Sequence, residues 1–594
     1  MSKKGYFTFV LHSHLPYVVG HGTWPHGTDW LYEASCETYL PLLNVLDRLV
    51  REGISPQVTL GLTPILLEQL ASQEFKEGLK GYIQAKMEIA LENQKTFSSA
   101  GERQFAGLAS FWYDYYQAKL KDFKESYQED LTLAFKKLQS GGHIEIMTSC
   151  ATHGYLPLLG EDISVEAQIK QGISTYLKYF GQKPKGFWLP ECAYRPGYEW
   201  ASPLGMRKKI KRKGVDYFLA RNGLKYFIID TPMLKGGKTI GVYLERFKAL
   251  EQLWKQFKKG YRPQPESKEK TPYEVYYLKG AGEGKEVAVF TRDPITALQV
   301  WSGEHGYPGD GWYLDFHKKY FPGGLRYWRV TSSKSDLGSK LLYQPEKARE
   351  RIRENANHFV NLVHNSLKNY FSKTHLPGIV TAPYDAELFG HWWFEGPEFL
   401  YLALKGISQD PEIELTTCSR YLSKRRPQTI IELPEGSWGE GGFHWIWFNQ
   451  LTKWVWKYIY QAEKEMKEIV HKSRSSSHPV RSRAPMATAP DKYRGTSNGT
   501  SRLKVRLLKQ LARELLLLES SDWPFLISTL SARDYAEIRA SRHYEDFQRI
   551  YKMIKGLLKG RPVSKSELSF LIECEKRDNI FEEIDPDWWR ENNA

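Results

Sequence analysis

Cysteine is scarce in this chain of 594 residues, and its few copies follow no pattern. The five cysteines are odd in number and form no CxxC pair: Cys36, Cys150, Cys192, Cys418 and Cys574. This argues against both a disulfide framework and a structural zinc site. A reducing compartment fits such a composition, so we expect a cytoplasmic protein.

Long apolar runs are missing as well. No run approaches the roughly 20 residues that a membrane-spanning helix needs, so we expect no membrane partner. The apolar stretch near the N-terminus is short, ends at His12 and His14, and lacks a small-residue cleavage site. It predicts a first β-strand rather than a signal peptide.

Positive charge is plentiful but local. The net charge is +15, and the stretch from Lys472 to Arg506 holds nine Lys or Arg residues against one acid, 9 − 1 = +8. Ser, Pro, Gly and Thr are frequent there, so we expect a disordered basic insertion at about 472–502. Only Tyr493 accompanies the charge as a stacking aromatic, and we therefore do not expect nucleic acid as a partner.

Aromatic residues make up 14% of the chain and include 19 tryptophans. Flat rings stack on the apolar faces of sugars, although they also serve as packing mass. Carbohydrate is therefore the first partner to consider. The sequence does not indicate an oligomeric state.

Short apolar runs alternate with long helical patterns, which is typical of an α/β barrel or a doubly wound sheet. Five runs predict strands: 6–12, 142–149, 185–190, 286–292 and 378–384. Helical patterns dominate after about residue 425. The chain is also longer than the length at which a single hydrophobic core stops growing. We expect a catalytic domain at 1–425, with a charged surface excursion at about 248–285, and a helical domain at 426–594.

Polar residues gather where the predicted strands end. His12 and His14 follow the first strand, His153 the second, Glu191 the third and Asp385 the last. Active sites of α/β barrels form at this end of the strands. Cleavage of a glycosidic bond with retention needs two carboxylates about 5 to 5.5 Å apart, and Glu191 and Asp385 are the natural pair.

Simpler roles remain open for these residues. Either acid could pair with a nearby base such as Arg195, and a histidine at a strand end is often structural. His12, His14 and His153 with an acid could instead hold zinc, as in a deacetylase. A glucan-binding protein without catalysis is a further alternative, although such a protein would be expected to lose one of the two carboxylates.

Five separated motifs carry a family resemblance: HSHLPY (12–17), GHIEIMTSCATHGY (142–155), GFWLPECAYRP (186–196), APYDAELFGHWWFEGP (382–397) and GSWGEGGFHWIWFN (436–449). With them the chain resembles glycoside hydrolase family 57, and within it the 1,4-alpha-glucan branching enzymes. The resemblance implies an incomplete (β/α)7 barrel, a small helical insertion at about 195–230, and a C-terminal α-helical domain.

The resemblance also implies roles for single residues. Glu191 matches the family's nucleophile and Asp385 its general acid/base, with no cofactor or metal required. The substrate would be an α-glucan such as amylose or glycogen, whose chain is cut at an α-1,4 bond and transferred to a 6-hydroxyl. Substrate-binding positions are expected at His12, His14, His153, Arg292, Gly309, Trp438 and Asp522, and aromatic groove positions at Trp24, Trp301 and Trp447.

Two departures from the family pattern bear on the outcome of the reaction. Ser531 stands where similar enzymes carry a glutamine, and the charged stretch rewrites the loop whose tyrosine shields the intermediate from water in those enzymes, where Tyr243 is a candidate. Poorer shielding would favour water as acceptor. An α-amylase or a 4-α-glucanotransferase that uses the same carboxylates is therefore the alternative to branching.

Overall fold

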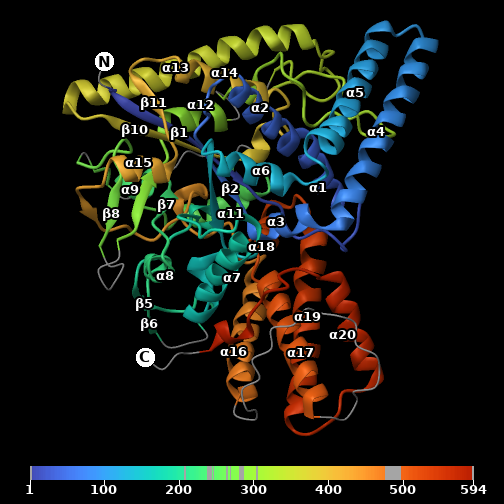
Figure 1. Cartoon of the computed structure of the whole chain (residues 1–594), viewed down its shortest axis with the longest axis vertical. Helices are drawn as coiled ribbons and strands as arrows, with labels where there is room; N and C mark the ends of the chain where they lie inside the picture. Colours follow the sequence, from blue (N-terminus) through green and yellow to red (C-terminus); the bar gives the residue numbers. More distant parts are fainter. Residues whose placement is uncertain are drawn as a thin grey trace.

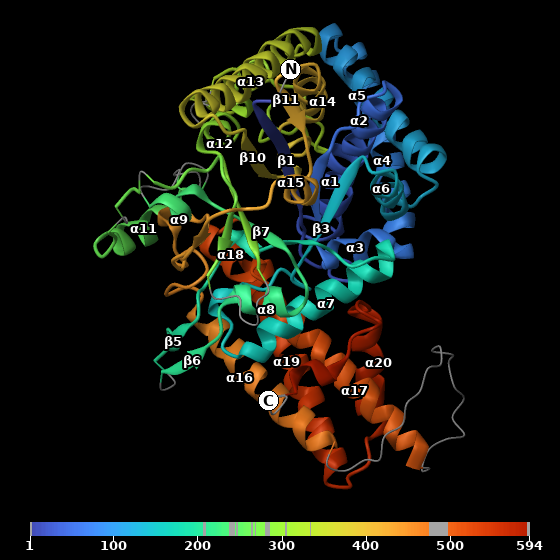
Figure 2. The same cartoon turned by 60° about the vertical axis from the view of Figure 1, so that its left-hand side comes forward.

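The computed structural model describes most of the chain: residues 3–205, 209–236, 244, 247–262, 265–267, 269–279, 286–302, 306–332, 334–474 and 497–590. An α/β part lies beside a bundle of long helices formed by the C-terminal residues (Figure 1 and Figure 2). No helix within these ranges is long and apolar enough to cross a membrane.

The α/β part is built on a curled parallel sheet. Within the described ranges, seven parallel strands run in the order β10-β1-β2-β3-β4-β7-β9. They are β1 (Gly5–Ser13), β2 (Val58–Leu62), β3 (Ile144–Ser149), β4 (Gly186–Trp188), β7 (Tyr226–Ile229), β9 (Ala288–Thr291) and β10 (Gly378–Asp385). A parallel bridge between Arg292 and Thr381 brings the two ends together. The incomplete (β/α)7 barrel is thereby confirmed.

All five predicted strands are present, as β1, β3, β4, β9 and β10. Every residue of β1, β2 and β9 is buried. Parallel strands covered on both faces have nearly continuous apolar sequences, which explains runs such as FTFVL in β1. Three short strands lie beside the parallel core: β8 (Tyr276–Leu278), β11 (Ile413–Leu415) and β12 (Ile430–Ile431).

Amphipathic helices cover the outside of the sheet. In α13 (Pro345–Thr374), Ile352, Phe359 and Val363 recur at helical spacing and are buried, and the helix packs on β1 and β10. The other covering helices are α1 (Thr28–Ala34), α2 (Leu40–Arg51), α3 (Pro64–Ala71), α6 (Leu131–Ser140), α7 (Asp162–Phe180), α9 (Thr231–Lys235), α12 (Pro294–Trp301), α14 (Gly396–Ser408) and α15 (Cys418–Lys424). A hairpin of α4 (Gln73–Ser99) and α5 (Arg103–Lys121) projects from the barrel (Figure 1).

The segment expected as a helical insertion, 195–230, is only partly helical. It holds an antiparallel hairpin of β5 (Tyr198–Trp200) and β6 (Ile210–Arg212), then α8 (Val215–Arg221), and then β7 of the main sheet. The physical reason is local: YFII in β7 is a fully buried apolar run, and Trp200 is buried against the charged Arg212, whose guanidinium lies 5.0 Å from the ring centroid.

The charged stretch 248–285 is more than a surface excursion. Its helix α11 (Leu250–Lys258) packs Trp254 and Phe257 against Trp445, and β8 pairs antiparallel with β9. Charges dominate the stretch, but its aromatic residues hold it to the barrel. Residues 263–264, 268 and 280–285 of the stretch lie outside the described residues.

The C-terminal helices are α16 (Lys453–Arg474), α17 (Ser497–Leu518), α18 (Asp522–Thr529), α19 (Arg533–Leu558) and α20 (Lys565–Arg577). Because β12 pairs with β8, the chain stays in the barrel beyond the expected boundary at 425/426, and the helices begin at residue 453. Most of the basic insertion, 475–496, lies outside the described residues.

Candidate active site

Both predicted catalytic carboxylates lie at C-terminal ends of barrel strands. Asp385 is the last residue of β10 and is in register with His12 of β1. Glu191 lies in the short turn Pro190–Cys192 that follows β4. The pKa of the Cys192 thiol is raised, first by burial and further by negative charges that include Glu191 and Asp385. Both carboxylates therefore lie near enough to Cys192 to act electrostatically on its thiol.

The backbone around Glu191 is strained. Glu191 has φ 59° and ψ 26°, and Cys192 and His153 also have positive φ, 49° and 58°. Residues other than glycine pay roughly 1–3 kcal/mol for such conformations, which cluster at functional sites.

Trp438 holds the Glu191 carboxylate. Its indole Nε1–H donates to Glu191 Oε2 at 2.7 Å, and its backbone N–H donates to the Glu191 carbonyl at 3.1 Å. His153 Nδ1 lies 4.0 Å from Glu191 Oε1. The Glu191 side chain is 15% exposed, so the carboxylate keeps a small face toward solvent and any bound substrate.

Three histidines form a layered wall beside Glu191. The rings of His14 and His153 stack with centroids 4.0 Å apart, His12 stacks on Trp188 at 4.4 Å, and His12 Nε2 lies 3.1 Å from His153 Nε2. Burial lowers the pKa of His12 and of His153 well below the ordinary value, and the neighbouring histidines lower it further. His12 and His153 are therefore neutral at physiological pH and suited to hydrogen bonds with hydroxyl groups.

The helical domain contributes directly to this wall. Ser521 Oγ lies 2.8 Å from His153 Nδ1, and the Ser521 N–H donates to the His153 carbonyl at 3.2 Å. Both carboxylate oxygens of Asp522 lie 3.0 Å from His14 Nε2. The turn between α17 and α18 thus fixes two of the three histidines, and α18 lies between the barrel and the long helices (Figure 1).

A second buried carboxyl group stands two residues after Asp385. Glu387 Oε1 accepts from the Tyr39 hydroxyl at 2.6 Å and from the His14 N–H at 3.1 Å. Burial raises the pKa of Glu387 to about 8, with a further contribution from the charge of Asp385. Glu387 is therefore protonated at neutral pH and ties the end of β10 to the end of β1.

Arg292 is held by a strand-end acid. Its Nε and Nη2 donate to the two oxygens of Asp230 at 2.8 and 2.7 Å, and its guanidinium carbon lies 5.7 Å from the centroid of the Trp438 ring. Asp230 follows β7 directly. This bidentate pair places the guanidinium beside the indole that holds Glu191.

The other predicted binding residues lie at different places around the site. Trp301 ends α12 and packs edge-on against Trp438 at 6.1 Å, so it lies beside the indole that holds Glu191. Trp24 is 72% exposed on the loop between β1 and α1, and Gly309 lies in the short turn Tyr307–Gly309 after α12.

Trp447 departs from the expectation of a groove position. Its side chain is 0% exposed, and its ring stacks on Tyr155 at 4.5 Å. In this structure the ring of Trp447 is therefore packed inside the protein and presents no exposed face. Tyr243, the candidate shielding tyrosine, lies outside the described residues, and Ser531 hydrogen-bonds to Thr529 at 2.8 Å.

Sequence reasoning missed four groups that complete the site: Tyr39, Asp230, Glu387 and Ser521. Asp230 and Glu387 had a usable signal, because each carboxyl directly follows or adjoins a barrel strand. Tyr39 and Ser521 had none, because their partners are distant in the chain.

Among the described residues, three groups of side chains could bring three ligand atoms within 4.8 Å of one another: His21, His543 and Asp578; Glu33, Glu37 and His391; and Glu514, Asp546 and Cys574. Each already contacts a cationic side chain. Arg577 pairs with Asp578 and Asp546, and Arg326 with Glu37. We interpret all three as charge-compensated networks, and none includes the predicted catalytic pair.

Comparison with known proteins places the chain in a family. The model of glycosyl hydrolase family 57 matches residues 8–434, and the model of the C-terminal domain of 1,4-alpha-glucan branching enzyme matches residues 484–589. The 1,4-alpha-glucan branching enzyme of Thermococcus kodakarensis is 41% identical over 582 residues, which are 98% of this chain and 78% of that protein.

Solved structures agree with this assignment. The crystal structure of that Thermococcus enzyme in complex with glucose superimposes with a TM-score of 0.85 at 39% identity, covering 100% of this chain and 97% of that one. The branching enzyme of Pyrococcus horikoshii gives 0.83 at 37%, covering 99% and 97%. The α-amylase AmyC of Thermotoga maritima gives 0.77 at 26%, covering 99% and 100%. The chain therefore belongs to glycosyl hydrolase family 57, and its residues 484–589 match the C-terminal domain of the 1,4-alpha-glucan branching enzymes.

Proposed function

We propose that the protein is a cytoplasmic, retaining 1,4-alpha-glucan branching enzyme with Glu191 as nucleophile and Asp385 as general acid/base. The observation that carries the proposal is the position of both carboxylates at C-terminal ends of barrel strands, with Glu191 held by the indole N–H of Trp438. Similarity to branching enzymes over almost the whole chain supports the substrate class. The five cysteines are buried free thiols, as suits a reducing compartment.

In the first step, a Glu191 oxygen attacks the anomeric carbon of an α-1,4-linked glucose while the bond to the leaving O4 breaks. Protonated Asp385 gives its proton to that oxygen. The strained turn and the indole N–H of Trp438 hold the attacking carboxylate in one orientation. Little conformational entropy of this group is therefore lost on reaching the transition state.

In the second step, ionised Asp385 takes the proton from a 6-hydroxyl of an acceptor glucan. The acceptor oxygen forms a bond to the anomeric carbon, and the bond to Glu191 breaks, so both carboxyl groups return to their starting states. Neutral His12 and His153 would hydrogen-bond sugar hydroxyls in both steps, and His14, held by Asp522, would extend the same wall.

Hydrolysis is the second candidate, because the α-amylase AmyC shares the fold over the whole chain. The two reactions use the same intermediate and differ only in the acceptor. The test is incubation with amylose, followed by a count of new α-1,6 linkages after debranching and of reducing ends in the same sample.

Branching predicts that α-1,6 linkages outnumber reducing ends and that Glu191→Gln abolishes both. Reducing ends alone would make the protein a hydrolase with the same catalytic pair. A fully active Glu191→Gln variant would overturn the assignment of the nucleophile.

A further inference from the structure

The loop between β1 and α1, residues 16–27, lies against the helical domain and not only against the barrel. We call it the Trp24 loop. The Tyr17 hydroxyl donates to the Arg577 carbonyl at 3.3 Å, and the Arg539 guanidinium donates to the Tyr17 carbonyl. At Gly20, with φ 77°, an added Cβ would lie 2.9 Å from the Arg577 carbonyl oxygen. The contact is close enough to require glycine.

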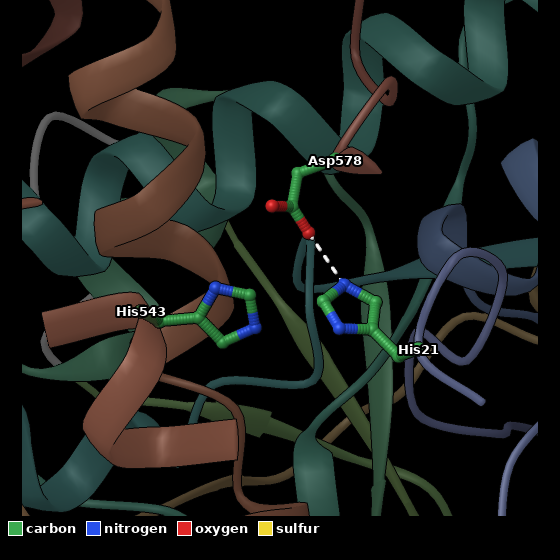
Figure 3. A group of neighbouring side chains, drawn as sticks. All are labelled: His21, His543 and Asp578. Carbon is green, nitrogen blue, oxygen red and sulfur yellow. Dashed lines mark hydrogen bonds and ion pairs between the residues drawn. The ribbon is translucent and has the colours of Figure 1, made fainter. Parts of the chain in front are cut away.

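His21 forms the deepest contact of this loop. Figure 3 shows its ring pointing toward Asp578, whose Oδ1 lies 2.6 Å from His21 Nε2, and both side chains are 0% exposed. Burial, together with the positive charge of Arg539, lowers the pKa of His21 to about 4. His21 is therefore neutral at physiological pH, and its Nε2–H donates to the carboxylate.

His543 stands beside this pair but is fully occupied by other partners (Figure 3). Arg539 can only donate, so its contact of 3.1 Å makes His543 Nε2 an acceptor. The remaining proton is on Nδ1, which donates to Glu514 at 2.7 Å. Arg577 contacts the other oxygen of Asp578 at 2.8 Å. The guanidinium groups of Arg539 and Arg577 thus supply the positive charge of this cluster. We interpret the cluster as a structural anchor that holds the Trp24 loop to the helical domain.

The free part of the loop begins three residues after His21. Trp24 is 72% exposed, and the chain is next held at His26, whose ring lies 6.0 Å from that of Tyr535 in α19. The large indole of Trp24 is thus exposed to solvent on a short segment between two histidines that contact the helical domain. The loop starts just after His14, so it leaves directly from the histidine wall of the active site.

We propose that the helical domain positions Trp24 for binding of the glucan chain through the buried His21–Asp578 contact. His21 and Asp578 are then positioning residues that act on substrate through another side chain. This inference rests on the proposed function. It gives the helical domain two separate tasks, one at the histidine wall through Ser521 and Asp522, and one at the Trp24 loop.

The test is a double-mutant cycle between His21→Ala and Trp24→Ala, with His21→Gln to restore an amide donor. Loss of an aromatic stacking partner corresponds to about a twofold to tenfold change in affinity. We expect Trp24→Ala and His21→Ala each to raise KM for amylose by such a factor, with kcat within about twofold. The double variant should be no worse than the worse single variant, and His21→Gln should recover most of the loss.

Gln171→Ala is the matched control. Gln171 of α7 donates to Glu583 Oε1 at 2.6 Å, so it is another part-buried contact between barrel and helical domain, and it involves no residue of the Trp24 loop. We expect it to lower the thermal midpoint without changing KM. If His21→Ala behaves like Gln171→Ala, or if the His21 and Trp24 effects multiply independently, the positioning role is overturned.

A second readout separates this inference from the proposed function. The cycle is repeated as maltoheptaose binding by calorimetry in the inactive Glu191→Gln background, where no turnover is needed. Coupled losses of affinity without branching in the wild type would retain the positioning role and refute the branching assignment. Branching by the wild type together with uncoupled losses of affinity would refute the positioning role and retain the branching assignment.

Discussion

Trp438→Phe tests how the nucleophile is controlled. The substitution keeps an aromatic ring against Trp188 and Trp301 but removes the indole N–H that donates to Glu191 Oε2 at 2.7 Å. A hydrogen bond to a charged group contributes about 1.5–3 kcal/mol, and one pKa unit corresponds to about 1.4 kcal/mol. Because Glu191 is only 15% exposed, solvent replaces little of this interaction. The pKa of the carboxyl should rise by about 1 to 2 units.

The assay is the pH dependence of kcat/KM for branching of amylose. Glu191 must be ionised to attack, so its pKa sets the acid limb of the profile. We expect that limb to move up by about 1 to 2 pH units in Trp438→Phe, while the alkaline limb stays in place.

Trp188→Phe is the matched control, because Trp188 is as deeply buried but its Nε1 has no hydrogen-bond partner among the described residues. It should leave the acid limb unchanged whatever it does to the rate. An acid limb that does not move in a folded Trp438→Phe protein would refute the argument.

Three further outcomes follow from the site. Asp522→Asn replaces the carboxylate that contacts His14 and should lower kcat/KM for amylose by roughly tenfold. Circular dichroism should show an unchanged fold. An unchanged kcat/KM would show that the His14–Asp522 contact is dispensable. Glu387 keeps its proton in the folded state up to a pKa of about 8, against an ordinary value of 4.5, so its contribution to stability is complete below pH 4.5 and is lost as pH rises through 8. Glu387→Gln should therefore lose less in thermal midpoint between pH 5.5 and 8.5 than the wild type, and an equal loss would contradict the raised pKa. Trp447→Ala should destabilise the protein by about 3–5 kcal/mol, whereas Trp447→Phe should keep KM unchanged, since the ring is buried on Tyr155; a raised KM in a stable Trp447→Phe protein would place it in the groove after all.

Much of the barrel end was predictable, because strand ends meet at one mouth in any parallel barrel. The runs before His12, Glu191 and Asp385 are long or apolar enough to be recognised as strands, and the register of β1 with β10 then brings His12 beside Asp385. The predicted roles of Glu191 and Asp385 stay predictions until the variants are assayed.

What escaped prediction depends on distance along the chain or on exposure. Strand β7 is four residues long, so its YFII run did not stand out within a segment expected to be helical. Ser521 meets His153 across 368 residues, which no local pattern records. Aromatic identity does not reveal burial, which is why Trp24 and Trp447 received the same expectation although one is 72% and the other 0% exposed.

The contact of His14 with Asp522 also determines when, during synthesis of the chain, the site can form. The two residues are 508 positions apart, and synthesis at about 5–20 residues per second takes roughly 25 to 100 s to cover that interval. A nascent chain that has completed β10 already carries both carboxylates, yet the histidine beside them has no carboxylate partner until α18 has left the ribosome. The site is therefore completed late, and a growing chain should begin to process glucan only after α18 has been synthesised.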